Sequence, residues 1–399
     1  MKRIHCMMAR AAGHAAAIAA VLGAIGQSRA IGDPLPPPAA SLTSWPMYRG
    51  GPELMGCAPG QPPTNLVLRW SARTGEPIKS SAAIVDDRVF VGSDDGQLHC
   101  FRLADGRSMW AQKTGGPIES SPLVWRGRVY AGSSDGFLYC WDAGTGRPEW
   151  KFETGDRVLG APSWTTSPQG DAAWILVGSY DFKLHCVDAQ TGRRMWAYET
   201  GNYINGAPAV WRGHAVFGGC DAVLHVVRLS TGELAKSVEA GAYVAGSGAV
   251  RGDRFFFGHY ENEYLCVDLE AGQILWRYKD RAFPYLSSPA VSGDRVIFGG
   301  RDKRLHCVQA TDGARIWQFT TRGKVDSSPV VWGDAVFVGS DDGRLYGVSL
   351  ADGRERWSYE IGQPLTASAA VASGWIVIGS EDGSLYAFSR PADPPAAQP

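Results

Sequence analysis

Short apolar runs, each bounded by Gly, Asp or Ser, recur along the chain from about residue 66 to residue 389. Two examples are residues 128–131, which read RVYA, and residues 335–338, which read AVFV. Runs that are rich in β-branched and aromatic residues and lie between turn-forming residues are typical of strands joined by tight hairpins. The pattern therefore predicts that this part of the chain is all-β.

The runs are organised by a motif that returns at a nearly fixed interval. It is most complete at residues 339–346, which read GSDDGRLY. Its eight copies begin at Gly92, Gly132, Gly178, Gly218, Gly258, Gly299, Gly339 and Gly379. Each unit contains four strand-like runs, which predicts a four-stranded antiparallel sheet with two faces to bury. Eight such units predict an eight-bladed β-propeller, in which neighbouring blades cover one another.

A tryptophan follows the first glycine of most units by 18 residues. Lys236 takes this place in the fourth unit, and the eighth unit ends after its third strand without a tryptophan. The missing strand stands before the first unit, where Trp70 occupies the expected place. We therefore expect a strand at residues 66–72 to complete the last blade and close the ring, which leaves no open sheet edge.

The ends of the chain differ in character from the repeats. Residues 1–30 combine a basic start, an alanine-rich apolar run and a small-residue ending, which is the pattern of a secretory signal peptide. Residues 31–65 are a Pro-rich linker and N-terminal packing segment, whose aromatic stretch 45–50 we expect on the outside of the ring. Residues 66–389 are the propeller, and residues 390–399 a disordered tail.

This organisation predicts secretion into the bacterial periplasm. An uncleaved membrane anchor is the alternative, although the apolar run is short for a membrane span. No other stretch is apolar enough to cross a bilayer after signal cleavage. The chain has 39 basic and 40 acidic residues and no clustered basic stretch, so we expect no nucleic-acid partner.

Cysteines recur at a fixed place in the repeat. Five of them lie eight residues after their repeat glycine: Cys100, Cys140, Cys186, Cys266 and Cys307. Equivalent places in neighbouring blades are about 10 Å apart, too far for a disulfide, so we expect buried free thiols. Cys57 and Cys220 lie outside this pattern, and the sequence leaves open whether they are free or paired.

Histidines and carboxylates also recur by position. The shared histidines, His99, His185, His225 and His306, lie in four different blades, too far apart to hold one zinc ion. Every unit has an acidic residue in its hairpin, where Asp is favoured because its side chain hydrogen-bonds the local backbone. These residues are Asp95, Asp135, Asp181, Asp221, Glu261, Asp302, Asp342 and Asp382. A calcium or substrate ring is the alternative, but we predict no metal site and no catalytic residue.

The repeat, most complete at residues 327–357, resembles that of the pyrroloquinoline quinone (PQQ)-like β-propellers, and all eight units carry it. The resemblance implies that the repeat tryptophans dock between neighbouring blades. These are Trp70, Trp110, Trp150, Trp196, Trp276, Trp317 and Trp357, with Lys236 departing from the pattern.

Two branches of this family imply different functions. The dehydrogenases bind the quinone with calcium on the ring axis, often against a disulfide between adjacent cysteines, and this chain has no Cys-Cys pair. The non-catalytic branch includes the lipoprotein of the outer-membrane β-barrel assembly machinery, whose lipid-attachment cysteine is absent here. We predict a non-enzymatic cell-envelope scaffold that binds envelope proteins and needs no cofactor. The alternatives are a small-molecule or glycan receptor and a PQQ-dependent oxidoreductase.

The candidate binding face is predicted from departures from the repeat, because the repeat itself is explained by folding. In an up-and-down blade, the Asp-containing hairpins and the interblade crossings emerge on one face. Units three to six place aromatic or cationic residues there: Tyr180, Tyr203, Tyr243, His259, Tyr260, Phe283, Tyr285, Arg301 and Lys303. Aromatic residues with cations beside them favour binding of a peptide, glycan or ring-shaped ligand, whereas loop packing or drift is the alternative.

Overall fold

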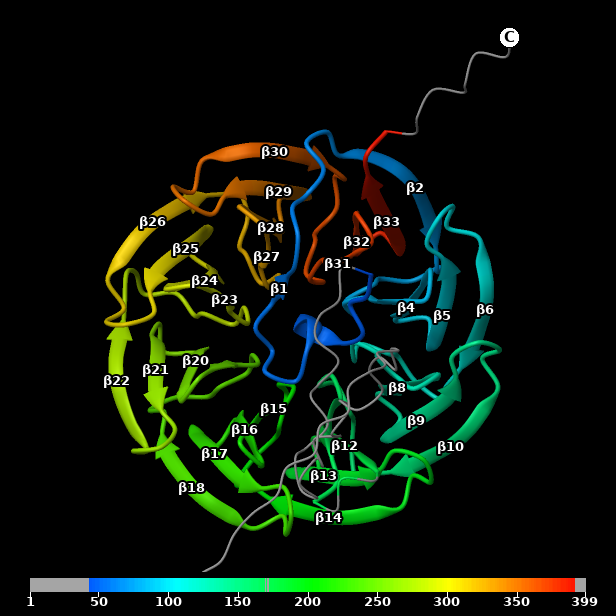
Figure 1. Cartoon of the computed structure of the whole chain (residues 1–399), viewed down its shortest axis with the longest axis vertical. Helices are drawn as coiled ribbons and strands as arrows, with labels where there is room; N and C mark the ends of the chain where they lie inside the picture. Colours follow the sequence, from blue (N-terminus) through cyan, green and yellow to red (C-terminus); the bar gives the residue numbers. More distant parts are fainter. Residues whose placement is uncertain (1–42, 169, 171, 392–399) are drawn as a thin grey trace, which may run out of the picture. The chain divides into compact units, whose positions relative to one another are not determined.

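The computed structural model describes residues 43–168, 170 and 172–391. The predicted signal peptide, the start of the predicted linker and most of the predicted tail lie outside these residues. The described part contains 33 strands and one short 3-10 helix. They form eight sheets of antiparallel strands that follow one another around an axis (Figure 1). The prediction of an all-β, eight-bladed propeller is confirmed.

The blades are numbered in chain order and their strands from the axis outward. Blade 1 consists of β3 (Ala83–Val85), β4 (Arg88–Gly92), β5 (Gln97–Arg102) and β6 (Ser108–Lys113), and blade 2 of β7 (Leu123–Trp125), β8 (Arg128–Gly132), β9 (Phe137–Asp142) and β10 (Pro148–Glu153). Blade 3 consists of β11 (Ser163–Thr166), β12 (Ala173–Gly178), β13 (Lys183–Asp188) and β14 (Arg194–Glu199), and blade 4 of β15 (Ala209–Trp211), β16 (His214–Gly218), β17 (Val223–Arg228) and β18 (Leu234–Glu239). Blade 5 consists of β19 (Ala249–Arg251), β20 (Arg254–Gly258), β21 (Tyr264–Asp268) and β22 (Gln273–Tyr278), and blade 6 of β23 (Ala290–Ser292), β24 (Arg295–Gly300), β25 (Arg304–Gln309) and β26 (Arg315–Thr320). Blade 7 consists of β27 (Val330–Trp332), β28 (Ala335–Gly339), β29 (Arg344–Ser349) and β30 (Glu355–Glu360), and blade 8 of β31 (Ala370–Ala372), β32 (Trp375–Gly379), β33 (Ser384–Ser389) and β2 (Val67–Arg73).

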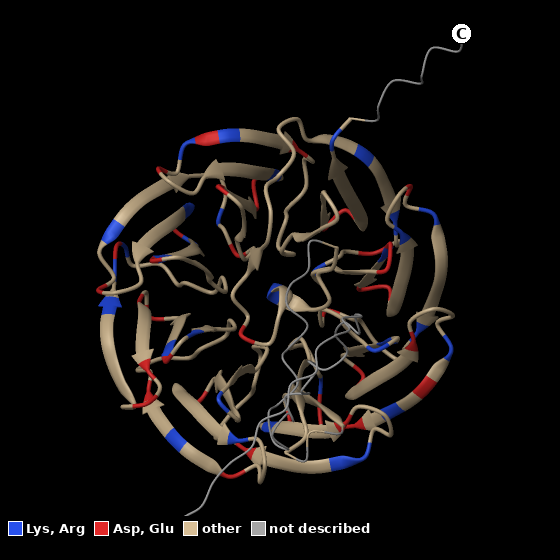
Figure 2. Cartoon of the chain, in the orientation of Figure 1, with Lys and Arg blue, Asp and Glu red and all other residues tan. Residues whose placement is uncertain are grey.

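Burial within a blade falls from the axis to the rim. In blade 7, β27 and β28 are buried at every position, because neighbouring blades cover both faces of the sheet. They accordingly read as continuous apolar runs rather than as an alternation. The outermost strand β30 is exposed or half-buried throughout and carries three charged residues, Glu355, Arg356 and Glu360. Figure 2 shows basic and acidic segments interspersed around the ring.

The outermost strand of every blade carries a β-bulge beside the repeat tryptophan or Lys236. Bulges increase the local twist and redirect a side chain. Seven indole N–H groups donate to backbone carbonyl oxygens of the next blade: those of Trp70, Trp110, Trp150, Trp196, Trp276, Trp317 and Trp357. Lys236 departs from the repeat but keeps the contact, since its Nζ donates to the Leu269 carbonyl oxygen at 2.9 Å.

The last blade is completed from the N-terminal side, as predicted. Strand β2 pairs antiparallel with β33, and Trp70 lies opposite Ala387. The Trp70 indole is buried and donates to the Leu103 carbonyl oxygen in blade 1 at 2.7 Å. The ring is therefore closed by chain segments more than 300 residues apart, which pair as neighbours in one sheet.

The aromatic segment before β2 lies at the ring axis, so its predicted place on the outside is wrong. Helix η1 (Tyr48–Gly50) is at the centre of the ring in Figure 1, and β1 (Cys57–Ala58) pairs parallel with β27. Six innermost strands each donate one backbone N–H to this segment, from Ile84, Val124, Val210, Val250, Val291 and Val331. The innermost strands are sheet edges whose N–H groups need acceptors, and the N-terminal segment supplies them.

Candidate functional site

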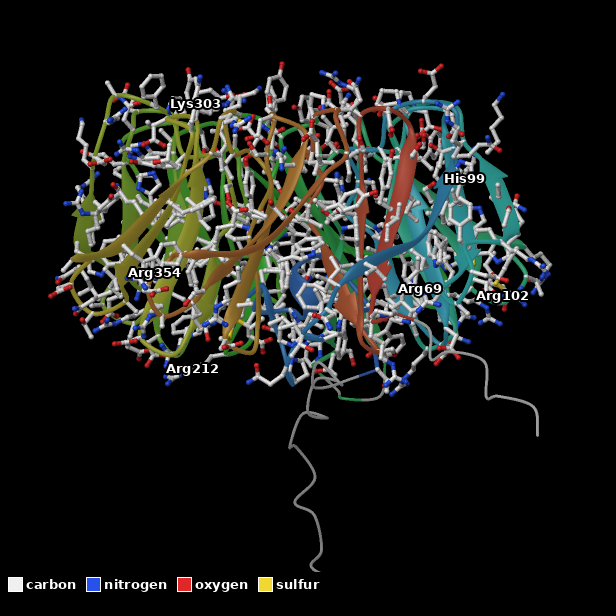
Figure 3. All side chains as sticks on the ribbon, turned by 90° about the horizontal axis from the view of Figure 1, so that it is seen from above. Arg69, His99, Arg102, Arg212, Lys303 and Arg354 are labelled. Carbon is white, nitrogen blue, oxygen red and sulfur yellow. The ribbon has the colours of Figure 1, made fainter. Side chains whose placement is uncertain are left out.

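The hairpins between the second and third strands of the blades meet the interblade crossings on one face, here called the crossing face. The backbone N–H of Tyr180 donates to the carbonyl oxygen of Arg157, that of Cys220 to the carbonyl oxygen of Tyr203, and that of Tyr260 to the carbonyl oxygen of Tyr243. Figure 3 shows Lys303, a hairpin residue of blade 6, on one face of the ring and Arg212 on the opposite face. The predicted hairpin and crossing residues therefore share a face.

Six of the eight acidic hairpin residues accept the backbone N–H two residues later, as the turn interpretation predicts; within the described part of the chain, Glu261 and Asp302 do not. Asp135 accepts hydrogen bonds from the backbone N–H of Phe137 at 3.2 Å and from that of Gly115 in the crossing at 2.7 Å. Its other contact is the Tyr139 hydroxyl, which donates at 2.7 Å. Asp181 makes the same kind of contacts in blade 3, where His185 takes the place of the tyrosine and its Nε2 lies 2.9 Å from the Asp181 carboxylate. Burial would raise the pKa of Asp181, but these hydrogen bonds outweigh it and lower the pKa to about 2.

Exposed apolar side chains gather on the crossing face. Among the described residues, nine large hydrophobic side chains are exposed, and five of them lie on hairpins or crossings of blades 3 to 6: Phe182, Tyr203, Tyr243, Tyr260 and Phe283. Their exposed fractions run from 38% to 56%. The others are scattered on outermost strands, where single exposed apolar residues are ordinary. The concentration on one sector is what distinguishes this surface.

Three aromatic rings and a guanidinium form a stack at the start of this sector. The Tyr180 and Tyr203 rings are stacked with centroids 4.5 Å apart, and Phe182 meets Tyr203 edge-on at 5.1 Å. The Arg157 guanidinium lies 4.6 Å from the centroid of Tyr180. Partial burial raises the pKa of the Tyr180 phenol, so it stays neutral near pH 7. The arrangement combines the partly exposed rings of Tyr203 and Phe182 with a cation nearby.

Two of the predicted site residues do not reach the surface. His259 and Tyr285 are 2% and 1% exposed, so they cannot contact a partner directly. Tyr285 packs edge-on against Phe298 and His306 in the interior of blade 6. Burial also lowers the pKa of His259. Both residues are part of the packed interior beneath the crossing face.

The cationic residues predicted in blade 6 behave differently from each other. Arg301 is tied to Asp326 by two hydrogen bonds of 2.9 Å, so its guanidinium is already paired. Lys303 is exposed and lies in the left-handed region of backbone conformation.

Blades 3 to 6 share a second departure, which the sequence analysis did not use. The other four blades have a positive-φ glycine in this hairpin: Gly96, Gly136, Gly343 and Gly383. In blades 3 to 6 the same place is held by Phe182, Ala222, Asn262 and Lys303, with φ between 66° and 70°. An L-residue in this conformation costs roughly 1–2 kcal/mol. Phe182 was missed as a site residue, although its place in the glycine position was visible in the sequence.

A cavity of about 200 Å³ lies on the ring axis. Two or three residues of each crossing line its wall, and in six blades one of them is a serine: Ser81, Ser121, Ser247, Ser288, Ser328 and Ser368. Each serine Oγ accepts a backbone N–H from a neighbouring blade. The Tyr48 hydroxyl, which belongs to the N-terminal segment, donates to Ser288 Oγ at 3.0 Å and bounds the cavity.

Among the described residues, one group has the composition and spacing to hold a metal ion: Asp280, Asp302 and His306, whose ligand atoms lie within 4.8 Å of one another. Gln318 donates to Asp280 Oδ2 at 2.9 Å and lies 3.1 Å from His306 Nδ1. Arg304 donates to the same carboxylate oxygen at 3.0 Å. Asp302 Oδ1 lies 3.1 Å from His306 Nε2, whereas Asp302 Oδ2 has no partner among the described residues. Because the other ligand atoms are hydrogen-bonded and a guanidinium adjoins them, we interpret the group as a buried network rather than a metal site.

The cysteines of the described part are free. The five equivalent thiols are buried, and burial raises their pKa; that of Cys100, for example, is about 12. Cys57 and Cys220, whose state the sequence left open, are also unpaired. In the part of the chain that the structure describes, no helix is long and apolar enough to span a membrane.

A family model described as outer membrane protein assembly factor BamB matches residues 67–163, 138–288 and 261–392. No curated protein sequence is detectably similar to the chain.

Several solved structures share the fold. BamB from Moraxella catarrhalis is 18% identical, with a TM-score of 0.69 over 82% of this chain and 100% of that chain. Quinohemoprotein alcohol dehydrogenase from Comamonas testosteroni is 13% identical, with a TM-score of 0.77 over 90% of this chain and 83% of that chain. The computationally designed Ika8 protein is 15% identical, with a TM-score of 0.71 over 83% of this chain and 100% of that chain.

Proposed function

The chain belongs to the family of PQQ-like β-propellers represented by the outer membrane protein assembly factor BamB, and from this premise we propose that it is a non-enzymatic protein-interaction scaffold of the bacterial cell envelope. The proposal places it in the periplasm. Solved structures with this fold include both BamB and an alcohol dehydrogenase, so the fold alone does not choose between scaffold and enzyme.

The observation that carries the proposal is the sector of exposed aromatic residues over blades 3 to 6. Tyr203, Tyr243 and Phe283 lie on three successive crossings, and each exposes 40% or more of its surface. Tyrosine and other aromatic residues are enriched at protein–protein interfaces, where they supply a large contact area with few rotatable bonds. A folding requirement alone would bury these rings or replace them with polar residues.

Backbone strain under the same sector supports a functional reading. Phe182 adopts a φ of 70° where the other half of the ring uses glycine. A bulky residue in this region is uncommon, and strained backbone concentrates at binding and active sites. Glycine would relieve the strain but would remove the ring that lies 5.1 Å from Tyr203. The backbone strain at Phe182 is therefore tied to keeping its ring in the aromatic surface.

The residues at the axis do not fit a PQQ cofactor with calcium. The cavity of about 200 Å³ is smaller than the roughly 300–1,000 Å³ typical of pockets for organic ligands of that size. Tyr48 is its one aromatic wall residue within the described part. The wall carboxylates Glu119 and Asp326 are each ion-paired, with Lys79 and Arg301. These features support a role without the quinone.

The test compares partner capture by two matched variants. The face variant is Tyr203→Ala, Tyr243→Ala, Phe283→Ala, and the control is Met109→Ala, Leu234→Ala, Leu275→Ala. The control removes three equally exposed apolar side chains from outermost strands. Immobilised full-length protein is incubated with a detergent-solubilised native envelope, and captured proteins are quantified by mass spectrometry.

We expect the face variant to capture at least tenfold less of the specific partner, which corresponds to about 1.4 kcal/mol of binding free energy. The control variant should capture as much as the wild type. Equal capture by both variants would refute the sector as the interface. Dye-linked alcohol oxidation by protein incubated with PQQ and calcium would overturn the non-enzymatic assignment.

A further inference from the structure

The wall of the axial cavity offers hydrogen-bond donors that the protein itself does not use. Ser121 Oγ accepts the backbone N–H of Ser81 at 2.9 Å, and Ser81 Oγ accepts that of Ser368 at 2.9 Å. A hydroxyl group in this position still has its own proton to donate. Within the described part, no acceptor is hydrogen-bonded to the hydroxyl protons of Ser81, Ser121, Ser247 or Ser368. These buried hydroxyls line the cavity from blades 1, 2, 5 and 8.

A buried positive charge lies directly behind this wall. Arg49 is 2% exposed and donates to the carbonyl oxygen of Ser328, a wall residue, at 3.3 Å and to that of Pro289 at 2.7 Å. The titratable groups that act on it are Tyr48, Cys57 and Tyr264, and none is a carboxylate. Among the described residues, Arg49 forms no ion pair. Burial of a cation is costly, and here it is offset by hydrogen bonds to three carbonyl oxygens, including that of Pro329, but not by a counter-charge; an anion bound nearby would supply one.

The carboxylates at the cavity do not supply that counter-charge. Glu119 lies 3.5 Å from Lys79, and Asp326 is held by Arg301 at 2.9 Å and by Lys324 at 3.3 Å. Each is therefore ion-paired with a cation of a crossing or hairpin, although Lys79 lies closer to Asp94, at 2.8 Å, than to Glu119. The unused hydroxyl dipoles and the guanidinium behind the wall add positive potential inside the cavity and act against the negative charge of these two paired carboxylates.

We infer that the axial cavity is a binding site for a small oxyanion, a carboxylate or a phosphate. Hydroxyl protons that converge on an anion form short, charge-assisted hydrogen bonds. A volume of about 200 Å³ accommodates a small carboxylic acid or a phosphate group with a short substituent. The inference does not depend on the scaffold proposal, since the cavity lies inside the ring and the aromatic sector on its face.

The test measures anion binding to the full chain by isothermal titration calorimetry in chloride-free buffer, with inorganic phosphate and acetate as separate probes. Ala245→Leu adds a side chain to the cavity wall without removing a hydrogen bond. Ala314→Leu adds the same group at an exposed turn away from the axis and serves as the control. A third variant, Arg49→Met, removes the buried charge, with far-UV circular dichroism as a check on folding.

We expect saturable binding of at least one probe, weakened tenfold or more by Ala245→Leu and unchanged by Ala314→Leu. Binding of phosphate alone identifies a phosphate ligand, and binding of acetate alone a carboxylate. The inference is overturned if neither probe binds the wild type, or if Ala245→Leu binds as tightly as the wild type. A folded Arg49→Met variant that retains full affinity overturns the role of the guanidinium.

Discussion

The contact between neighbouring blades can be tested at Trp276, whose equivalent in blade 4 is Lys236. Trp276 is 8% exposed and donates its indole N–H to the Ala310 carbonyl oxygen at 3.1 Å. Its ring covers Gly313, where an added Cβ would lie 2.8 Å from the ring. Trp276→Ala removes this packing and leaves a void between blades 5 and 6. We expect a loss of about 3–5 kcal/mol in the free energy of unfolding.

Replacement by lysine separates the hydrogen bond from the aromatic packing. The Lys236 ammonium donates to the Leu269 carbonyl oxygen, and its stem covers Gly272, where an added Cβ would lie 2.6 Å from the stem. Trp276→Lys should reproduce both contacts and cost roughly 1–3 kcal/mol, less than alanine, because the stem remains packed. Lys236→Trp should be neutral or stabilising by about 1–2 kcal/mol, since the glycine seat and the acceptor are already present.

The assay is urea denaturation followed by far-UV circular dichroism, which does not depend on the tryptophan being replaced. The expected order of denaturation midpoints is Lys236→Trp, wild type, Trp276→Lys and Trp276→Ala, from highest to lowest. If Trp276→Lys unfolds at the same midpoint as Trp276→Ala, the ammonium does not substitute for the indole. If Lys236→Trp lowers the midpoint, the junction between blades 4 and 5 is closed by contacts other than those described.

Three further perturbations address the ring closure, a strained hairpin and an acidic turn. Deletion of residues 60–73 removes β2 with Trp70 and exposes the edge of β33 and the seat of Trp70 on blade 1, so the melting temperature should fall and aggregation should increase, as measured by light scattering during a thermal scan. Ala222→Gly relieves a φ of 66° and should stabilise the protein by about 0.5–1 kcal/mol in urea denaturation. The pKa of Asp181, lowered to about 2, implies stability that is present above pH 4 and lost as the pH falls towards 2, because the unfolded carboxyl binds its proton first. Asp181→Asn should therefore flatten this part of the stability profile, which a pH series of melting temperatures measures.

The repeat made most of the fold predictable, because equivalent positions carry equivalent contacts. The interval of about 40 residues gave the blade number, and the missing last strand gave the closure through Trp70. These inferences need only the requirement that each sheet bury two faces and leave no edge open. The place of residues 45–50 was not predictable by the same logic. The repeat describes how blades pack on each other and says nothing of the N–H groups that their innermost strands direct to the axis.

The candidate site was predicted only in part, because two residues were aligned with the wrong repeat positions. Tyr285 lies 14 residues before its repeat glycine, where the other blades have fully buried Ile, Val or Leu, such as Ile78 and Val244. Its neighbour Pro284 is the equivalent of Tyr203 and Tyr243. His259 follows the repeat glycine directly, at a place where Ser93 and its equivalents are fully buried. A strict alignment of all eight units excludes both residues from the surface.

The two halves of the ring differ in three ways that coincide. At one position of the crossings that line the cavity, blades 3 to 6 carry the uncharged residues Leu159, Asn205, Ala245 and Leu286, whereas blades 1, 2, 7 and 8 carry Lys79, Glu119, Asp326 and Thr366, three of them charged. The exposed aromatics and the hairpins without glycine also fall in blades 3 to 6. Neutral drift would distribute such changes among eight equivalent units, whereas one contact surface concentrates them in neighbouring blades. The coincidence therefore favours a single partner that covers half of the crossing face and leaves the charged half in solvent.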